Sequence, residues 1–199
     1  MLKKAFVWLS RIRCRCGYGV HSPFAFDLIT NVFYEKTPYY AYAHLKKQEE
    51  KVGKRGEPSL KVKRLLFRLV NRTQPSVIVD AGQPSNAAQY LKAAKKEVRY
   101  ISILPGHELS LEKDLAVDFL YLHCSENPSF VEKAFEYCLN HTHQNTVFVI
   151  GDIYCSKQMK TLWEQFKERE EVGITFDLYN VGILFFDKTK IKQHYTVNF

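Results

Sequence analysis

The sequence predicts an α/β protein with a mostly parallel sheet that ends in an antiparallel pair of strands and follows a helical N-terminal region. Short apolar runs alternate with helical segments from about residue 75 onward, which is typical of a parallel sheet covered by helices on both faces. Two strand-like runs near the C-terminus leave no room for a helix between them. The 199 residues, 46% of them hydrophobic, are expected to form one structural domain.

Residues 1–72 are expected to form a helical extension packed on an α/β core of residues 73–199. A helix should begin at Ser22-Pro23, because serine is a favoured N-cap and proline suits the first helical position. Further helices are predicted over residues 39–51 and 60–71, the latter with an apolar stripe between Lys and Arg residues.

The first residues combine a basic start with an apolar stretch, residues 5–9, and so resemble the beginning of an export signal. Arginines follow this stretch at once and no small-residue cleavage site appears, so a basic amphipathic helix is the better interpretation. No apolar run reaches the ~20 residues of a membrane span. The five cysteines show no framework spacing, which indicates reduced thiols in a cytoplasmic protein.

The α/β core is predicted from apolar runs that have the length and the β-branched and aromatic content of buried strands. Strands are expected over residues 76–80, 100–104, 117–122 and 146–150, and helices over residues 87–95, 129–140 and 156–169. Residues 174–179 and 181–186 are also strand-like, with only Asn180 clearly between them. These two should pair antiparallel, because a parallel pair would need a crossover of a dozen or more residues.

Charge is unevenly distributed along the chain. Residues 1–72 carry 16 Lys and Arg against 5 Asp and Glu, whereas residues 73–199 carry 13 against 16. The basic half could attract nucleic acid, an anionic membrane surface or an acidic protein partner. The alternative is a solvated basic face that serves solubility.

Several segments resemble a known family. They are Gly19-Val20-His21-Ser22-Pro23-Phe24 and residues 66–71, 147–159, 177–186 and 192–195. On these segments the chain resembles class I S-adenosylmethionine-dependent methyltransferases of the O-methyltransferase type, and more narrowly a group from Bacteroidetes that begins with the Gly-Val-His-Ser-Pro-Phe segment. The resemblance implies a Rossmann-like methyltransferase sheet, S-adenosylmethionine as cofactor and a small-molecule acceptor. Activity does not follow from the fold, because function belongs to the site.

The resemblance implies Asp80, Gly82 and Asn86 as cofactor-binding residues. The family places an acid at the end of the first strand and then glycines that let the backbone approach the cofactor. Asn86 stands at the second glycine, and asparagine tolerates a left-handed backbone better than most residues. Leu104 stands where the family has an acid that binds the ribose hydroxyls, and leucine cannot accept those hydrogen bonds.

The connection after the second strand is short. Only residues 105–116 lie between Leu104 and the next strand, where the family has a helix, an edge strand and a second helix. Twelve residues suffice for one short crossover. We therefore expect the sheet to lack this edge strand and the adenine pocket to be open or absent.

His123 and Asp152 are the candidate catalytic residues. They stand at strand ends where the family often has carboxylates that hold a divalent metal or position the acceptor. The two side chains could act as an acid–base pair or bind a transition metal. The competing interpretation is structural, with Asp152 hydrogen-bonded near its strand end and His123 at the rim of a former pocket.

Three functions remain open at this point. The altered cofactor loop favours a non-catalytic relative that acts as a binding or interaction module through its basic N-terminal region. The first alternative is an active O-methyltransferase acting on a small hydroxyl-bearing acceptor. The second is nucleic-acid binding through residues 1–72, where basic and aromatic residues interleave.

Overall fold

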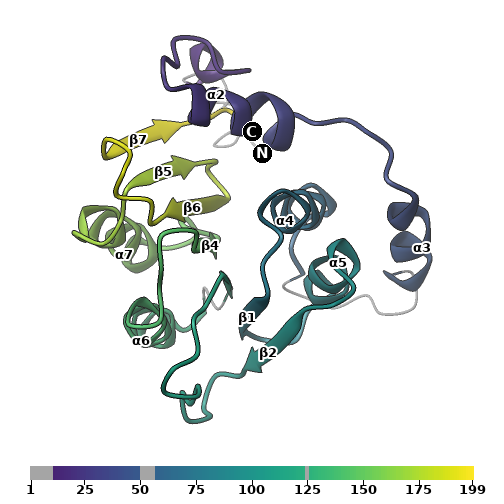
Figure 1. Ribbon diagram of the computed structural model, residues 1–199, viewed down its shortest axis with the longest axis vertical. Coiled ribbons are helices and arrows are strands. Elements are labelled where there is room, and N and C mark those ends of the chain that lie inside the picture. The colour runs from purple at the N-terminus through teal and green to yellow at the C-terminus, as the bar shows by residue number, and fades with distance from the viewer. Residues whose placement is uncertain (1–10, 50–56, 124–125) are drawn as a thin grey trace.

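A computed structural model describes residues 11–49, 57–123 and 126–199. A central sheet carries helices on both faces, and the N-terminal segments extend along and beyond one of these faces (Figure 1). The basic helix predicted at the start of the chain lies outside the described residues.

The predicted helices and strands are confirmed in type and order, and their described ends lie within two residues of the predicted ones. The N-terminal region contains η1 (Ile12–Cys14), α2 (Pro23–Leu28), η2 (Ile29–Phe33), α3 (Tyr40–Glu49) and α4 (Leu60–Thr73). The core contains β1 (Val77–Gly82), α5 (Ala87–Ala94), β2 (Arg99–Ile103), β3 (Phe119–His123), α6 (Pro128–Leu139), β4 (Val147–Gly151), α7 (Lys157–Glu168), β5 (Ile174–Asp177), β6 (Val181–Phe185) and β7 (Gln193–Thr196).

The sheet has the order β2-β1-β3-β4-β6-β5-β7. Strands β1 to β4 are parallel where they pair, and β6 runs antiparallel to both β4 and β5. The predicted C-terminal hairpin is therefore present, with β6 inserted between β4 and β5.

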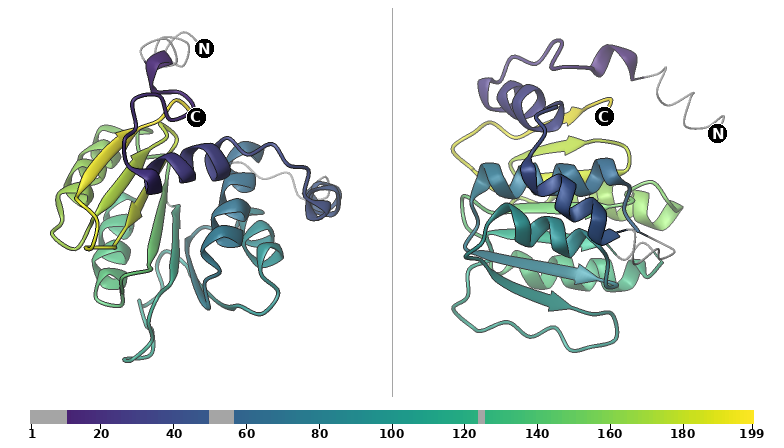
Figure 2. Two further views of the ribbon diagram at one scale, coloured as in Figure 1. Left: turned by 45° about the horizontal axis from the view of Figure 1, so that its top comes forward. Right: turned by 90° about the vertical axis from the view of Figure 1, so that its right-hand side faces the viewer.

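Strand β7 was not predicted, and it brings the sheet to seven strands by pairing parallel with β5. The opposite edge is β2, and residues 104–118 add no helix or strand beyond it. Figure 2 shows this connection as a long loop below β2. The edge strand is thus missing on the side where its absence was expected.

The two faces of the sheet have separate hydrophobic cores. One core joins the sheet to α2, η2, α4 and α5, and the other joins it to α6 and α7 (Figure 2). Trp163 of α7 lies so close to Gly182 of β6 that an added Cβ would meet its ring at 2.4 Å.

The α2 start matches its sequence signal, because the Ser22 side chain accepts a hydrogen bond from the backbone N of Ala25 and Pro23 follows. The helix continues into η2, a π-helical turn. Arg68 of α4, only 7% exposed, donates from Nε to the Val32 carbonyl at 2.6 Å and from Nη2 to the Phe33 carbonyl at 3.1 Å.

Within the described ranges, no helix is long and apolar enough to cross a membrane.

Candidate functional site

The carboxyl ends of β1, β3 and β4 lie side by side at one edge of the sheet. In register, Gly82 pairs with His123, and Leu122 pairs with Ile150 just before β4 ends. Ligands of open α/β sheets bind outside this edge. The strand ends therefore gather the predicted site residues in one region.

Asp80 is the centre of a buried hydrogen-bond cluster. Its carboxylate lies 2.7 Å from His123 Nε2, with side chains that are 6% and 10% exposed. The other carboxylate oxygen accepts a hydrogen bond from the Tyr100 hydroxyl of β2. Both oxygens of the predicted cofactor acid are thus engaged by side chains of this chain.

Aromatic rings complete this cluster. The His123 ring stacks on Tyr121 with centroids 4.3 Å apart and planes 13° apart. Burial, followed by the charge of Asp80, raises the pKa of Tyr100 and that of Tyr121. Both phenols therefore stay protonated, and Tyr100 remains a hydrogen-bond donor to Asp80.

Gly82 allows β1 to approach β3 closely at this point. A Cβ built on Gly82 would lie 2.7 Å from the backbone oxygen of His123 and 3.0 Å from its carbonyl carbon. The glycine is therefore explained by packing between the chain's own strands, whatever ligand lies beyond them.

Asn86 differs from its expected conformation. Its backbone is right-handed, with φ −66° and ψ −11°, and its side chain does not cap α5. The backbone N of Asn86 donates instead to the Glu57 carboxylate, 3.0 Å from each oxygen. Sequence reasoning did not single out Glu57, which is 29 residues away along the chain.

Asp152 lies one strand further along the same edge, directly after β4. It is exposed and has a left-handed backbone with φ +53°. Its backbone N donates to the Asn180 carbonyl at 2.6 Å, and its carbonyl accepts from the backbone N of Cys155. The structure thus pairs His123 with Asp80 and places Asp152 at the neighbouring strand end.

The described part of the chain holds no group of three His, Cys, Asp or Glu side chains arranged to bind a metal ion. A dinuclear or three-ligand site built on His123 and Asp152 therefore has no further described ligand.

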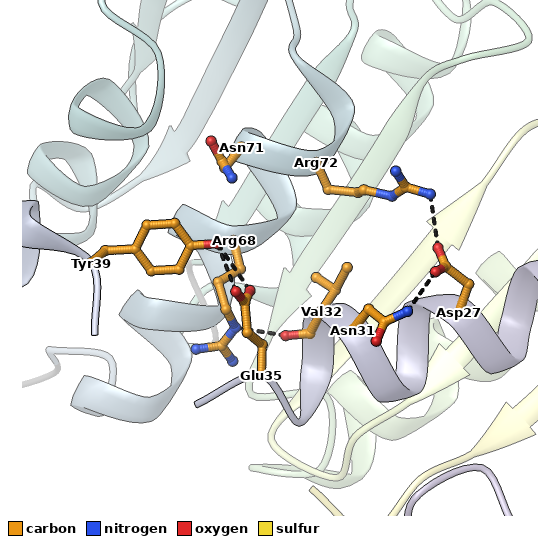
Figure 3. Close-up of a pocket in the computed structure, with 8 residues that line it drawn as sticks. All are labelled: Asp27, Asn31, Val32, Glu35, Tyr39, Arg68, Asn71 and Arg72. Atoms are coloured by element: carbon orange, nitrogen blue, oxygen red, sulfur yellow. Dashed lines mark hydrogen bonds and ion pairs between the residues drawn. The ribbon is translucent and has the colours of Figure 1, made fainter. Parts of the chain in front are cut away.

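A second polar region lies away from the strand ends. A hollow of about 430 Å³ is lined by Asp27, Asn31, Val32, Glu35, Tyr39, Arg68, Asn71 and Arg72 (Figure 3). It adjoins the C-terminal half of α4, which leads into the amino end of β1. Its charged groups are bound within the chain: Arg72 forms an ion pair with Asp27 at 2.8 Å, and Glu35 accepts hydrogen bonds from the Tyr39 hydroxyl.

No protein-family model matches the chain, and no curated protein matches it in sequence. Solved structures do match its fold. The O-methyltransferase TomG from Streptomyces achromogenes, in complex with S-adenosylmethionine, has a TM-score of 0.53 and 12% identity over 75% of this chain and 91% of its own. A Podospora anserina methyltransferase bound to S-adenosylhomocysteine has a TM-score of 0.51 and 8% identity over 83% of this chain and 96% of its own.

The chain therefore has the Rossmann-like fold of class I S-adenosylmethionine-dependent methyltransferases. At such low identity the likeness concerns the fold, and the chemistry must be argued from the site.

Proposed function

We propose that this methyltransferase-like chain no longer holds S-adenosylmethionine in the family's manner and acts as a non-catalytic binding or interaction module. The observation that carries this proposal is the state of Asp80. It is buried, and both of its oxygens already bind His123 and Tyr100. A carboxylate can accept about four hydrogen bonds, so a cofactor group would have to reach the remaining lone pairs of a carboxylate that is only 5% exposed and is surrounded by the chain's own side chains.

Two further features support the proposal. Glu57 places a carboxylate against the backbone N of Asn86 at the start of α5, and helix N-termini are where anionic ligand groups bind. Leu104 follows β2 and offers no acceptor for ribose hydroxyls, and residues 104–118 supply no helix or strand to wall an adenine pocket. The residues present thus do not fit the cofactor.

Calorimetric titration of the chain with S-adenosylmethionine and S-adenosylhomocysteine tests the proposal. A ligand present at 100 times its Kd stabilises the native state by about 2.7 kcal/mol, which a thermal melt detects easily. We expect no binding heat and no shift at 1 mM ligand. Stabilisation of that size would contradict the proposal.

A variant that restores a carboxylate after β2 provides a matched control. Leu104→Asp supplies the missing ribose acceptor, so it should bind the cofactor more tightly than the natural chain does. Adding Glu57→Ala opens the start of α5 and should strengthen binding further. If the wild-type chain binds the cofactor and neither substitution changes its affinity, the cofactor must use other residues.

An active O-methyltransferase is the second candidate, and the His123–Asp80 contact favours it. The carboxylate orients the imidazole at the edge where an acceptor would bind, and an oriented imidazole can take the proton of an acceptor hydroxyl. Transfer of a labelled methyl group to a panel of small phenols and alcohols tests this. Turnover that His123→Gln abolishes and Asp152→Asn reduces would establish it.

We infer that the basic N-terminal region is the contact surface for an acidic protein partner. Its described residues include the exposed Arg13, Arg15, Lys46, Lys47 and Lys61. Core packing of α2, η2 and α4 against the sheet supports treating residues 1–72 as an extension of the 73–199 core. The cysteines that the structure describes form no disulfide, which supports a cytoplasmic location.

Nucleic acid is the other anionic partner to test. If the basic region binds nucleic acid, the affinity of the chain for a generic labelled oligonucleotide should fall steeply between 50 and 200 mM salt, because binding releases counterions from the phosphates. A salt-sensitive complex of this kind would favour nucleic acid over a protein partner.

A further inference from the structure

A cation site lies at the carboxyl edge of the sheet, on the side of β5 and β6. Arg11 binds Asp177 there in a bidentate ion pair, with Nη1–Oδ1 2.8 Å and Nη2–Oδ2 3.1 Å. The two side chains are 15% and 12% exposed. The Arg11 guanidinium carbon also lies 5.7 Å from the Tyr154 ring centroid and 5.5 Å from that of Tyr179, within the range of cation–π attraction.

The receiving groups are held in place without help from Arg11. The Tyr154 hydroxyl donates to Asp177 Oδ2 at 2.6 Å, and the backbone N of Tyr179 donates to Oδ1 at 2.8 Å. The two tyrosine rings stack with centroids 5.6 Å apart. A carboxylate and two rings oriented in advance are the components of a guanidinium site.

Backbone conformation marks the same place. Tyr179 has φ +70°, and Asp152 on the adjoining loop has φ +53°. The loops are joined by the hydrogen bond from the backbone N of Asp152 to the Asn180 carbonyl. Left-handed backbone at non-glycine residues costs energy and clusters at ligand sites.

Arg11 comes from a segment that contributes few buried residues to the fold. It precedes η1, which has no buried residue, and a backbone hydrogen bond from Asn198 to Cys14 is a further long-range tie of this segment. Segments with few buried contacts open at low free energy. Release of the occupant would leave the Tyr154, Tyr179 and Asp177 contacts in place, because those contacts do not include Arg11.

We propose that Tyr154, Tyr179 and Asp177 form a recognition site for the guanidinium group of an arginine. Arg11 is its intramolecular occupant, and an arginine of a partner peptide, or free arginine, competes with it. The site lies on the same edge of the sheet as Asp152.

The test removes the occupant and supplies the group in solution. The Arg11→Ala variant is titrated with N-acetyl-arginine amide and, in a second arm, with free L-arginine, which separates a peptide arginine from the amino acid. A short tether gives an effective concentration in the millimolar range. Competition by Arg11 weakens binding to the wild-type chain by a factor of one plus this effective concentration divided by Kd. The variant should therefore bind the amide about 10-fold more tightly than the wild-type chain for a Kd of about 0.1 mM.

Controls isolate the site from general charge effects. N-acetyl-citrulline amide, which is neutral and nearly the same shape, should not bind. Arg13→Ala removes an exposed neighbour and keeps Arg11, so it should behave like the wild-type chain. Asp177→Asn in the Arg11→Ala background should abolish binding with the circular dichroism spectrum unchanged.

Arg11→Gln serves as a second variant if Arg11→Ala does not fold. Equal binding of the citrulline and arginine amides, or no arginine binding by either folded variant, would overturn the proposal. Arg11 would then be a structural tie for the N-terminal segment and nothing more.

Discussion

His123 Nε2 on β3 lies 2.7 Å from Asp80 Oδ1 on β1, so one buried contact joins the ends of two neighbouring parallel strands. The same contact occupies one acceptor position of the acid on which cofactor binding would depend, and it orients the imidazole on which acid–base chemistry would depend. The contribution of this contact to the free energy of unfolding can be measured without any ligand.

Replacing His123 by Leu should destabilise the chain by about 1–3 kcal/mol, because it leaves a buried carboxylate oxygen of Asp80 without that partner. Urea denaturation of His123→Leu, Asp80→Ala and the double variant measures this. Contacting residues usually couple by about 0.5–3 kcal/mol. Additive effects would show that the contact contributes nothing to stability.

Gly82→Ala should destabilise the chain more than Gly151→Ala does. The Cβ added at Gly82 would lie 2.7 Å from a backbone oxygen of His123, whereas at Gly151 the nearest atom is the His123 Cβ at 3.4 Å. Backbone cannot yield as a side chain can, so the first change should cost about 1–3 kcal/mol. Thermal melts of the two variants decide the matter, and equal stabilities would contradict the close approach.

The local pattern of apolar residues was enough to predict most helices and strands of the fold. Strand β7 shows where this pattern fails. Apolar runs marked every strand of the core except β7, whose residues are exposed apart from the partly buried Tyr195. A strand without an apolar pattern gives no periodicity to detect. Its pairing with β5 arises from tertiary contact.

The candidate site likewise contains residues that the sequence pattern placed correctly and contacts that it did not reveal. Strand ends brought Asp80 and His123 to one edge, as their positions implied. The Glu57 contact with Asn86 and the Arg11 contact with Asp177 join residues 29 and 166 positions apart, in segments that carry no recognised motif. Such contacts depend on tertiary packing between segments far apart in the chain, which the local sequence pattern does not specify.

Arg68→Lys should destabilise the chain far more than Arg72→Lys. Arg68 is buried and donates to the Val32 carbonyl at the end of the π-helical turn (Figure 3). It also donates to the carbonyl of Phe33. A lysine ammonium cannot reproduce that fork, and hydrogen bonds to charged groups contribute about 1.5–3 kcal/mol. Arg72 pairs with Asp27 in an exposed position, where such pairs contribute about 0–1 kcal/mol. Similar urea midpoints for the two variants would contradict this ranking.

His194 should make the chain less stable as the pH falls. Although His194 as a whole is exposed, partial desolvation of its ring, followed by the charge of Lys167, lowers its pKa below 6.5. Its Nδ1 lies 2.8 Å from the Thr175 hydroxyl across β7 and β5. Since the unfolded chain then binds more protons than the folded one, unfolding free energy must decrease as pH falls through about 6.5. Urea denaturation between pH 7.5 and 5.5 measures this slope, and His194→Asn should flatten it relative to the wild-type chain. Thr175→Val removes the hydroxyl but keeps the imidazole, so it should retain part of the slope; unchanged slopes in both variants would assign the pH dependence to another histidine.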